Sequence, residues 1–277
     1  MKTLLAIIKF QFHDTLRSKW LAIYTLFFLI LSYALLSFTK EPGKVILSLL
    51  NINMIVIPLT SLVFGTIYLY SNRDYIILIL SQPINRKVLF VGLYLGLSLP
   101  MAISFLVGTG IPLLIFIKIF SGESVVLLFL FLGGIFETFI FVSISFLIAS
   151  LNDNKMKGLG LAIFLWLFFS ALYDGLVLII MQIFMVYPIE VPAIVLTMLS
   201  PIDLARLLVI LNFDISALLG YTGAVYSQFL GSTTGLILSL LTLCIWVAIP
   251  FYLGLRCFNG LLPLYLFRCQ NKQILRR

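Results

Sequence analysis

Two acidic residues lie within long apolar runs of this sequence, Glu137 in the run at about 125 to 150 and Asp174 in the run at about 158 to 184. An ionised side chain at bilayer depth costs roughly 2.5 to 3.5 kcal/mol on insertion scales, so each carboxyl group is expected to face the protein interior, a cavity or a partner. We predict that both residues line a transport path, with neutral, protonated packing as the alternative.

The sequence offers no set of residues for catalysis in water. Its single histidine, His13, has no partner for a catalytic triad, and there is no G-x-x-x-x-G-K-[ST] loop to bind phosphates. Met181 and Met185 would share one helical face and could ligate Cu(I), but methionine is also an ordinary gap-filler in apolar helices. We expect a chain that is not an enzyme, does not hydrolyse ATP alone and holds no metal or cofactor of its own.

Six apolar runs must position these residues. They lie at about 20 to 38, 45 to 70, 88 to 117, 125 to 150, 158 to 184 and 233 to 255. Each run is long enough to cross a bilayer core about 30 Å thick, and lipid offers no hydrogen-bond partners to any backbone that is not helical. A composition of 62% hydrophobic and 10% charged residues excludes a water-soluble domain. The sequence predicts an all-α integral membrane protein, a single domain over residues 1 to 277 with six transmembrane helices.

Basic residues alternate between the gaps that separate these runs. Of the 18, 14 fall on one side of the predicted bilayer, namely Lys2, Lys9, Arg17, Lys19, Arg73, Arg86, Lys87, Lys155, Lys157, Arg256, Arg268, Lys272, Arg276 and Arg277. Cytoplasmic loops carry the excess of Lys and Arg, so both termini should face the cytoplasm. The net charge of +8 follows this orientation and contact with anionic lipid, so no nucleic-acid partner is expected.

Residues 1 to 19 are predicted to form an amphipathic helix before the first span. Its apolar face would carry Leu4, Leu5, Ile8, Phe12 and Leu16, and its opposite face Lys2, Lys9, His13 and Arg17. Such a helix is expected to lie flat in the cytoplasmic interface. It is either a charged membrane anchor or a contact for a specific partner.

A second short helix is predicted at residues 72 to 82, between the second and third spans. Ser71 or Asn72 can cap it, Asp74 lies in its first turn, and Pro83 ends it. The apolar patch from Ile76 to Leu80 then needs a cover, either lipid or another protein.

The segment from 185 to 232, before the last span, is predicted to be external and helical. Ser200, Pro201 and Asp203 form a helix start with a capping hydroxyl, proline in the first turn and an early acid. Asp214 could cap a second helix. We expect these helices to rest on the external membrane face.

These features together resemble an ABC-2 type transporter permease over nearly the whole chain. The resemblance rests on the N-terminal helix, the six spans, the stretch LSQPINRKVLFVGLYLG and the helical external segment. Within that family, SPIDLARLLVIL and DISALLGYTGAVYSQFLGS look like permeases that serve maturation of nitrous-oxide reductase.

The resemblance implies partners that composition alone does not. Two copies of the chain would form a transmembrane dimer in the inner membrane of a bacterial or archaeal cell. Two cytoplasmic ATPase subunits that bind ATP would dock beneath it. The coupling helix would comprise Arg73, Asp74, Tyr75, Ile76, Ile77, Leu78, Ile79 and Leu80, although family members often carry Gly-Thr where this chain has Tyr75 and Ile76. The N-terminal helix would be a connector, and an external or periplasmic protein would take part in assembly of the reductase's copper-sulfur centre.

Three other functions stay open on the sequence. The chain could belong to an ABC-2 exporter of drugs, lipids or ions. It could instead be an ATP-independent secondary transporter using Glu137 and Asp174, although no inverted repeat is evident and the spans contain few polar residues. It could also be a membrane anchor that only recruits partners.

Overall fold

The computed structural model describes residues 2–39, 41–82, 84–116, 124–183, 190–211 and 233–274, which contain helices and no strands. Six helical stretches there are long and apolar enough to cross a membrane: α2 (Lys19–Phe38), α3 (Pro42–Ser71), α5 (Arg86–Ile115), α6 (Ser124–Leu151), the continuous stretch Lys155–Ile183, and Gly235–Phe258 within α12 (Thr233–Ile274). The predicted all-α membrane fold with six spans is confirmed, and the predicted runs match the observed helices to within a few residues.

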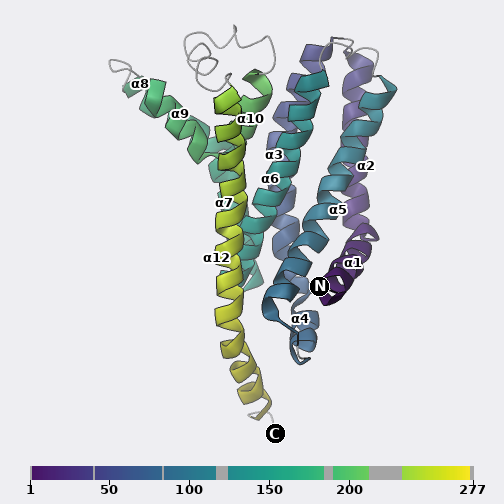
Figure 1. Cartoon of the computed structure of the whole chain (residues 1–277), viewed down its shortest axis with the longest axis vertical. Coiled ribbons are helices and arrows are strands. Elements are labelled where there is room, and N and C mark those ends of the chain that lie inside the picture. Colours follow the sequence, from purple (N-terminus) through teal and green to yellow (C-terminus); the bar gives the residue numbers. More distant parts are fainter. Residues whose placement is uncertain are drawn as a thin grey trace.

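The spans run roughly parallel, and short helices lie at both ends of the bundle (Figure 1). At one end lie α1 (Lys2–Leu16) and α4 (Arg73–Leu80), which we call the α4 end. Toward the opposite end, α8 (Tyr173–Ile183) and α9 (Glu190–Leu199) diverge from the bundle. α10 (Pro201–Leu211) lies near that end beside α12.

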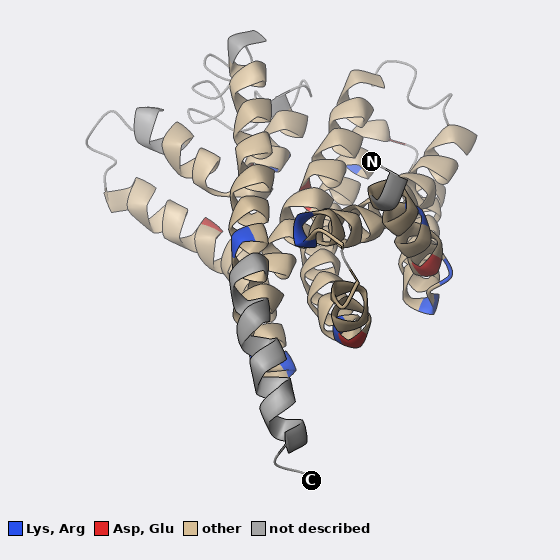
Figure 2. Ribbon diagram, turned by 60° about the horizontal axis from the view of Figure 1, so that its bottom comes forward, with Lys and Arg blue, Asp and Glu red and all other residues tan. Residues whose placement is uncertain are grey.

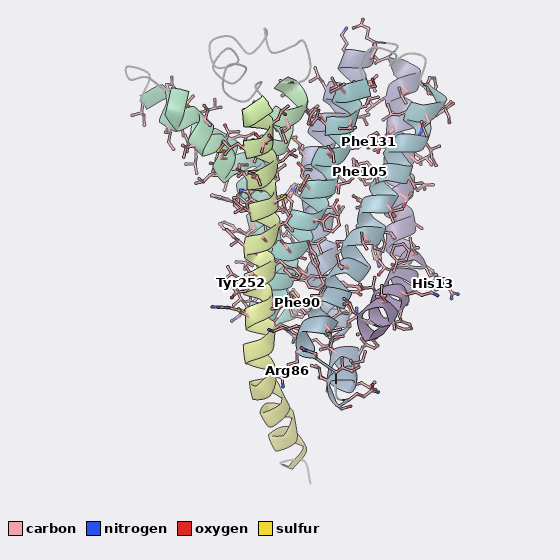
Figure 3. The ribbon with its side chains drawn as sticks, in the orientation of Figure 1. His13, Arg86, Phe90, Phe105, Phe131 and Tyr252 are labelled. Atoms are coloured by element: carbon pink, nitrogen blue, oxygen red, sulfur yellow. The ribbon has the colours of Figure 1, made fainter. Side chains whose placement is uncertain are left out.

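The core lies along α3, α5 and α6, where aromatic rings pack edge to face. The rings of Phe28 and Phe105 are 5.4 Å apart between centroids, and those of Phe90 and Phe146 are 5.6 Å apart. Figure 3 labels Phe90 and Phe105 inside the bundle, and it labels His13 on the outer side of α1. The exposed position of His13 agrees with its assignment to the polar face of that helix.

The N-terminal helix packs on a face that the sequence did not predict. Its buried residues are Ile7, Gln11 and Thr15, whereas Leu5 and Leu16 of the predicted apolar face are exposed. The physical reason lies in α5, where glycines allow the two helices to approach closely. A Cβ added at Gly96 would overlap the Gln11 side chain. The Gln11 Oε1 atom accepts a hydrogen bond of 2.6 Å from the Tyr68 hydroxyl of α3, which gives this buried oxygen a partner.

The predicted external segment is helical where the structure describes it, and α10 packs on the bundle. Ser200 caps α10 as predicted, because its Oγ accepts a 3.2 Å hydrogen bond from the Asp203 N–H. Leu204, Ala205 and Leu208 are buried against α3 and α6. The apolar stripe of α10 therefore packs against protein. The second helix predicted from Asp214 lies outside the described residues.

The fifth span contains a short π-helix, Phe168–Leu172, between α7 (Lys155–Leu167) and α8. Such wide turns interrupt the regular α-helical hydrogen bonding and occur frequently at functional sites. Asp174 is the second residue after this π-helix and lies in the first turn of α8.

Candidate functional site

The short helix predicted between the second and third spans is α4, at the end of the bundle that it shares with α1. Asn72 precedes it but does not cap it, because its Nδ2 donates a 2.9 Å hydrogen bond to the Tyr68 carbonyl in the last turn of α3. Asn72 is the one residue between α3 and α4, and its side-chain amide bonds to the end of α3 instead of the start of α4. Asp74 lies exposed in the first turn of α4 as predicted.

The apolar patch of α4 is divided between the protein core and the surface. Ile76 and Ile79 are buried and belong to the core cluster around Phe90. Ile77 and Leu78 are 40% and 62% exposed. The whole apolar patch of α4 was expected to need a cover of lipid or another protein. This was wrong, because the helix directs part of its apolar side chains toward the protein core.

Residues of α1 extend this exposed apolar area. The Phe10 ring, itself exposed, stacks on the Tyr75 ring with centroids 5.9 Å apart. We call Phe10, Tyr75, Ile77 and Leu78 the α1–α4 surface. An exposed apolar area of this kind is typical of a site that contacts another protein or the membrane.

The first residue of α4 connects it to the loop between α6 and α7. The Arg73 guanidinium donates hydrogen bonds of 2.8 Å to the Asp153 carbonyl and 3.1 Å to the Asn152 carbonyl. It also lies over the Tyr70 ring, 4.5 Å from the centroid. The Tyr70 hydroxyl in turn donates a 2.8 Å hydrogen bond to the Asn152 carbonyl. A displacement of α4 would thus be carried to α6 and α7.

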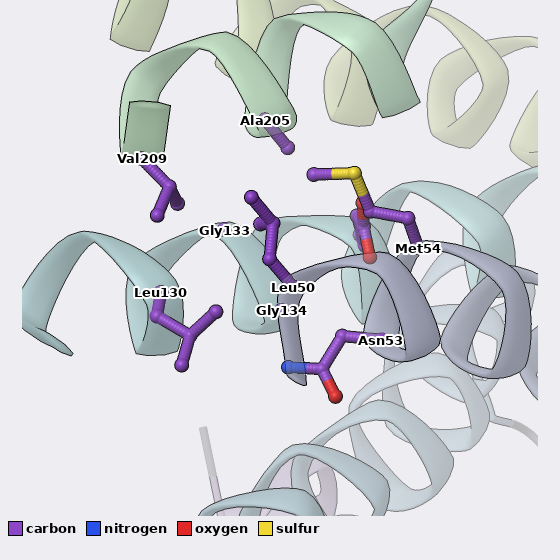
Figure 4. A pocket seen from close by; sticks show the side chains of 9 residues that line it. Leu50, Asn53, Met54, Leu130, Gly133, Gly134, Ala205 and Val209 are labelled. Atoms are coloured by element: carbon purple, nitrogen blue, oxygen red, sulfur yellow. The ribbon is translucent and has the colours of Figure 1, made fainter. Parts of the chain in front are cut away.

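Glu137 occupies a closed cavity inside the bundle. The residue is 1% exposed, and Asn53 of α3, which lines the same cavity, is 2% exposed. Glu137 Oε1 and both polar side-chain atoms of Asn53 have no hydrogen-bond partner. The cavity has a volume of about 10 Å³ and lies between α3, α6 and α10 (Figure 4), with apolar walls that include Leu50, Met54 and Val209.

Asp174 lies in a different hollow, beside a basic residue. The Arg206 Nη1 atom is 3.3 Å from Asp174 Oδ2 and 3.8 Å from Asp203 Oδ1. All three residues line an open pocket of about 370 Å³ whose remaining walls are mainly apolar. Two carboxyl groups and one guanidinium thus share this pocket.

The two carboxyl groups of this pocket influence each other. Burial, and next the nearby Asp174 carboxylate, raise the pKa of Asp203 to about 7, although the Ser200 hydroxyl and Arg206 act in the opposite direction. Near neutral pH this pocket therefore exchanges a proton at Asp203.

Arg206 also contacts the wall of the closed cavity. Its Nε lies 3.3 Å from the Met54 sulfur, and Met54 lines the cavity that holds Glu137. The structure therefore places Glu137 and Asp174 in separate hollows, with Arg206 and Met54 at the boundary.

Sequence reasoning missed Arg206, Asp203 and Asn53 as members of this polar group. Asp203 and Arg206 are three residues apart on one helix, a spacing that brings side chains together and could have been noticed. Asn53 had no such signal, since a single amide in a long apolar run resembles any polar interruption. Among the described residues, no group of three or more His, Cys, Asp or Glu side chains could hold a metal ion. Met185 lies outside them.

Comparisons with known proteins agree with this architecture. A family model described as "ABC-2 family transporter protein" matches residues 5–260. The chain is 28% identical over 228 residues to the "Probable ABC transporter permease protein NosY" of Pseudomonas aeruginosa, which covers 74% of this chain and 80% of the relative. It is 24% identical over 270 residues to the protein of the same name from Stutzerimonas stutzeri, which covers 90% of this chain and 95% of the relative.

Proposed function

Since this chain belongs to the ABC-2 transporter family and is an ABC transporter permease, we propose that it couples ATP hydrolysis by separate ATPase subunits to movement of its own spans. The α1–α4 surface carries this proposal, because it presents exposed apolar side chains on two short helices. An ATPase subunit docked there would cover Ile77 and Leu78. ATP would be bound by that partner and not by this chain.

The proposal places the α4 end in the cytoplasm, with both termini on that side. Figure 2 turns this end toward the viewer and shows Lys and Arg on helices that lie there. Arg73 and Arg86 lie at the start of α4 and α5, and Lys155 at the start of α7. Basic residues concentrate on the cytoplasmic side of membrane proteins, which supports this orientation in the inner membrane.

Force would pass from the ATPases to the spans by two routes. The first runs from α4 through Arg73 to the Asn152 and Asp153 carbonyls, and so to α6 and α7. The second runs from α1 through the hydrogen bond between Gln11 and Tyr68 to α3. Closure of two ATPases would thereby move packed helices as units, a known form of coupled domain motion.

A second copy of the chain is proposed as the partner within the membrane. The α7–α8 span is the least buried of the six spans, so its side chains face lipid or another chain. A homodimer would give two ATPase subunits two equivalent docking surfaces and would cover part of this span.

A role like that of NosY is proposed for the transporter. It is supported by the two relatives whose names identify them as NosY permeases, and by the SPIDLARLLVIL sequence that forms the well-packed helix α10. The transporter would then work with a periplasmic accessory protein in assembly of the copper-sulfur centre of nitrous-oxide reductase. Export of a drug, lipid or ion is the alternative within the same family.

The transport path is proposed to include Glu137 and Asp174, together with Arg206 between them. An ATP-independent carrier relaying protons directly from one carboxyl group to the other fits the geometry less well. The two carboxyl groups occupy separate hollows, and Asp174 is paired with Arg206 at 3.3 Å.

Affinity purification of the tagged chain in mild detergent, followed by mass spectrometry and an ATPase assay, tests the proposed function. We expect a P-loop ATPase in the eluate, and ATP turnover that is lost when its nucleotide site is inactivated. A periplasmic protein in the same eluate supports the NosY-like role. Recovery of the chain alone, with transport in proteoliposomes that lack ATP, would refute coupling to an ATPase.

A further inference from the structure

The closed cavity between α3, α6 and α10 holds more polar atoms than the protein itself satisfies. Glu137 Oε1, Asn53 Oδ1 and Asn53 Nδ2 are all buried without a hydrogen-bond partner. A buried polar atom left in this state destabilises the fold, because its hydrogen bonds to water are lost and not replaced. Three such atoms on two side chains that line one cavity point to a ligand able both to donate and to accept hydrogen bonds.

The size of the cavity restricts that ligand. Its volume of about 10 Å³ is close to the roughly 10 to 15 Å³ that one water molecule needs. A water molecule there can donate to Glu137 Oε1 and Asn53 Oδ1 and accept from Asn53 Nδ2. It would thus have three partners, the usual number for a buried water.

The charges around Glu137 fix its protonation state. The titratable and charged groups that face it from neighbouring helices are Tyr24 of α2 and Arg206 of α10, while α3 contributes the neutral Asn53. Arg206 pairs with Asp174 and Asp203 instead. A carboxylate without a direct partner at this depth would be strongly disfavoured, so Glu137 carries a proton in this conformation.

One wall of the cavity contacts a charged side chain. Met54 lines the cavity, and its sulfur accepts a 3.3 Å hydrogen bond from Arg206 Nε. Arg206 also lines the open pocket of about 370 Å³ on its other side. The contact between Arg206 and Met54 therefore lies between the closed cavity and the open pocket.

We propose that Asn53 and Glu137 form a closed site for one water molecule and one exchangeable proton, separated from the open pocket by the contact between Arg206 and Met54. When that contact opens, the Glu137 O–H bond breaks, its electrons stay on the carboxylate, and the proton passes to water from the pocket as hydronium. The reverse step restores the acid. The proposal adds a proton to the proposed transport path, but the binding site itself exists whether or not an ATPase is attached.

A hydrophobic carbodiimide tests the site, because it reacts with protonated carboxyl groups in apolar surroundings. The full chain, purified in detergent without ATPase, is treated with dicyclohexylcarbodiimide at a series of pH values. Mass spectrometry then measures the modified fraction of the Glu137 peptide over time. We expect modification at Glu137 that decreases as the pH rises, and none at the exposed Asp74.

Two variants of Met54 distinguish a closed site from general exposure. Met54→Ala removes the boundary side chain and should speed Glu137 modification at least several-fold, whereas Met54→Leu keeps the volume and should leave the rate near that of the unaltered chain. Absence of Glu137 modification in all three proteins, or a rate that is the same at every pH, would overturn the proposal. Since the assay contains no ATPase or ATP, its failure is distinct from a failure of the proposed coupling.

Discussion

Arg73, the first residue of α4, donates a 2.8 Å hydrogen bond to the backbone oxygen of Asp153 in the loop between α6 and α7. A second bond, of 3.1 Å, reaches the Asn152 carbonyl. α3, α4 and the loop that joins α6 to α7 thus meet at one guanidinium and the Tyr70 ring beneath it. This junction offers the most direct route by which a subunit bound at α4 could move the spans.

Replacing Arg73 should uncouple the complex without dissociating it. Arg73→Ala removes two hydrogen bonds from a charged donor, each worth about 1.5 to 3 kcal/mol. The ATPase should therefore still co-purify, but ATP turnover by the reconstituted complex should fall at least about tenfold, which corresponds to 1.4 kcal/mol. Lys87→Ala, an exposed basic residue at the same end, serves as the control. Unchanged turnover in Arg73→Ala would exclude this route.

The position of α1 should depend on the small size of Gly96. Gly96→Ala would drive a methyl group into the Gln11 side chain, whereas Gly160 has no atom within 4 Å of an added Cβ. In thermal unfolding in detergent, Gly96→Ala should lower the midpoint. Gly160→Ala should leave it unchanged or raise it, because alanine favours helix by about 1 kcal/mol. Equal midpoints for the two variants would mean that α1 is not fixed on α5 as described.

Asp203 should make stability depend on pH. In the folded protein the pKa of the Asp203 carboxyl group is raised from 3.8 to about 7. The folded state therefore binds a proton at Asp203 more tightly than the unfolded state does. The folded protein therefore gains stability as the pH falls from about 7 toward about 4, and loses it as Asp203 ionises.

Asp203→Asn should remove that dependence, because an amide does not ionise. At pH above 7 the variant should unfold a few degrees higher than the unaltered chain, by about 2 to 4 °C if the difference is near 1 kcal/mol. Near the low end of that pH range the two proteins should agree. A variant that is less stable than the unaltered chain at high pH would show that the Asp203–Arg206 pair is net stabilising.

Neutral substitution of Glu137 and of Asp174 should each alter ATP turnover, for different physical reasons. Glu137→Gln keeps an uncharged polar group in the cavity, so the fold and ATPase binding should persist while ATP turnover changes. Asp174→Asn removes the negative charge that lies beside Arg206. The Arg206 guanidinium is then free to move toward Met54 or Asp203. Turnover measured in the purified complex should be altered by both variants. Full indifference to both would favour a membrane anchor that only recruits partners.

Much of the architecture could be predicted because lipid imposes it. Runs of about 20 apolar residues must be helices, and a turn residue such as Pro83 marks where a short helix has to stop. The capping of α10 by Ser200 was equally readable, since it depends only on residues three positions apart. These are local rules that act within one segment.

What could not be predicted depends on contacts between distant segments. The face of α1 that carries Gln11 is buried because Gly96 and Tyr68 offer space and a hydrogen bond from two other helices. The apolar stripe of α10 would look the same against lipid, yet it packs on α3 and α6. In the sequence, Arg206 is only a basic residue outside the predicted cytoplasmic gaps. In the structure, it lies at the centre of the polar group around Asp174.

The most direct test of ATPase docking is recovery of the ATPase by chains altered on the α1–α4 surface. The unaltered chain, an Ile77→Asp Leu78→Asp double variant, and Met156→Asp would each be purified from membranes, and the ATPase bound per permease would be quantified. Met156 is the matched control because it is 77% exposed at the same end of the bundle, in the first turn of α7. The account predicts membrane insertion of all three chains and loss of at least nine-tenths of the ATPase, a shift of about 1.4 kcal/mol, only in the double variant. Normal recovery with both α4 substitutions would contradict it.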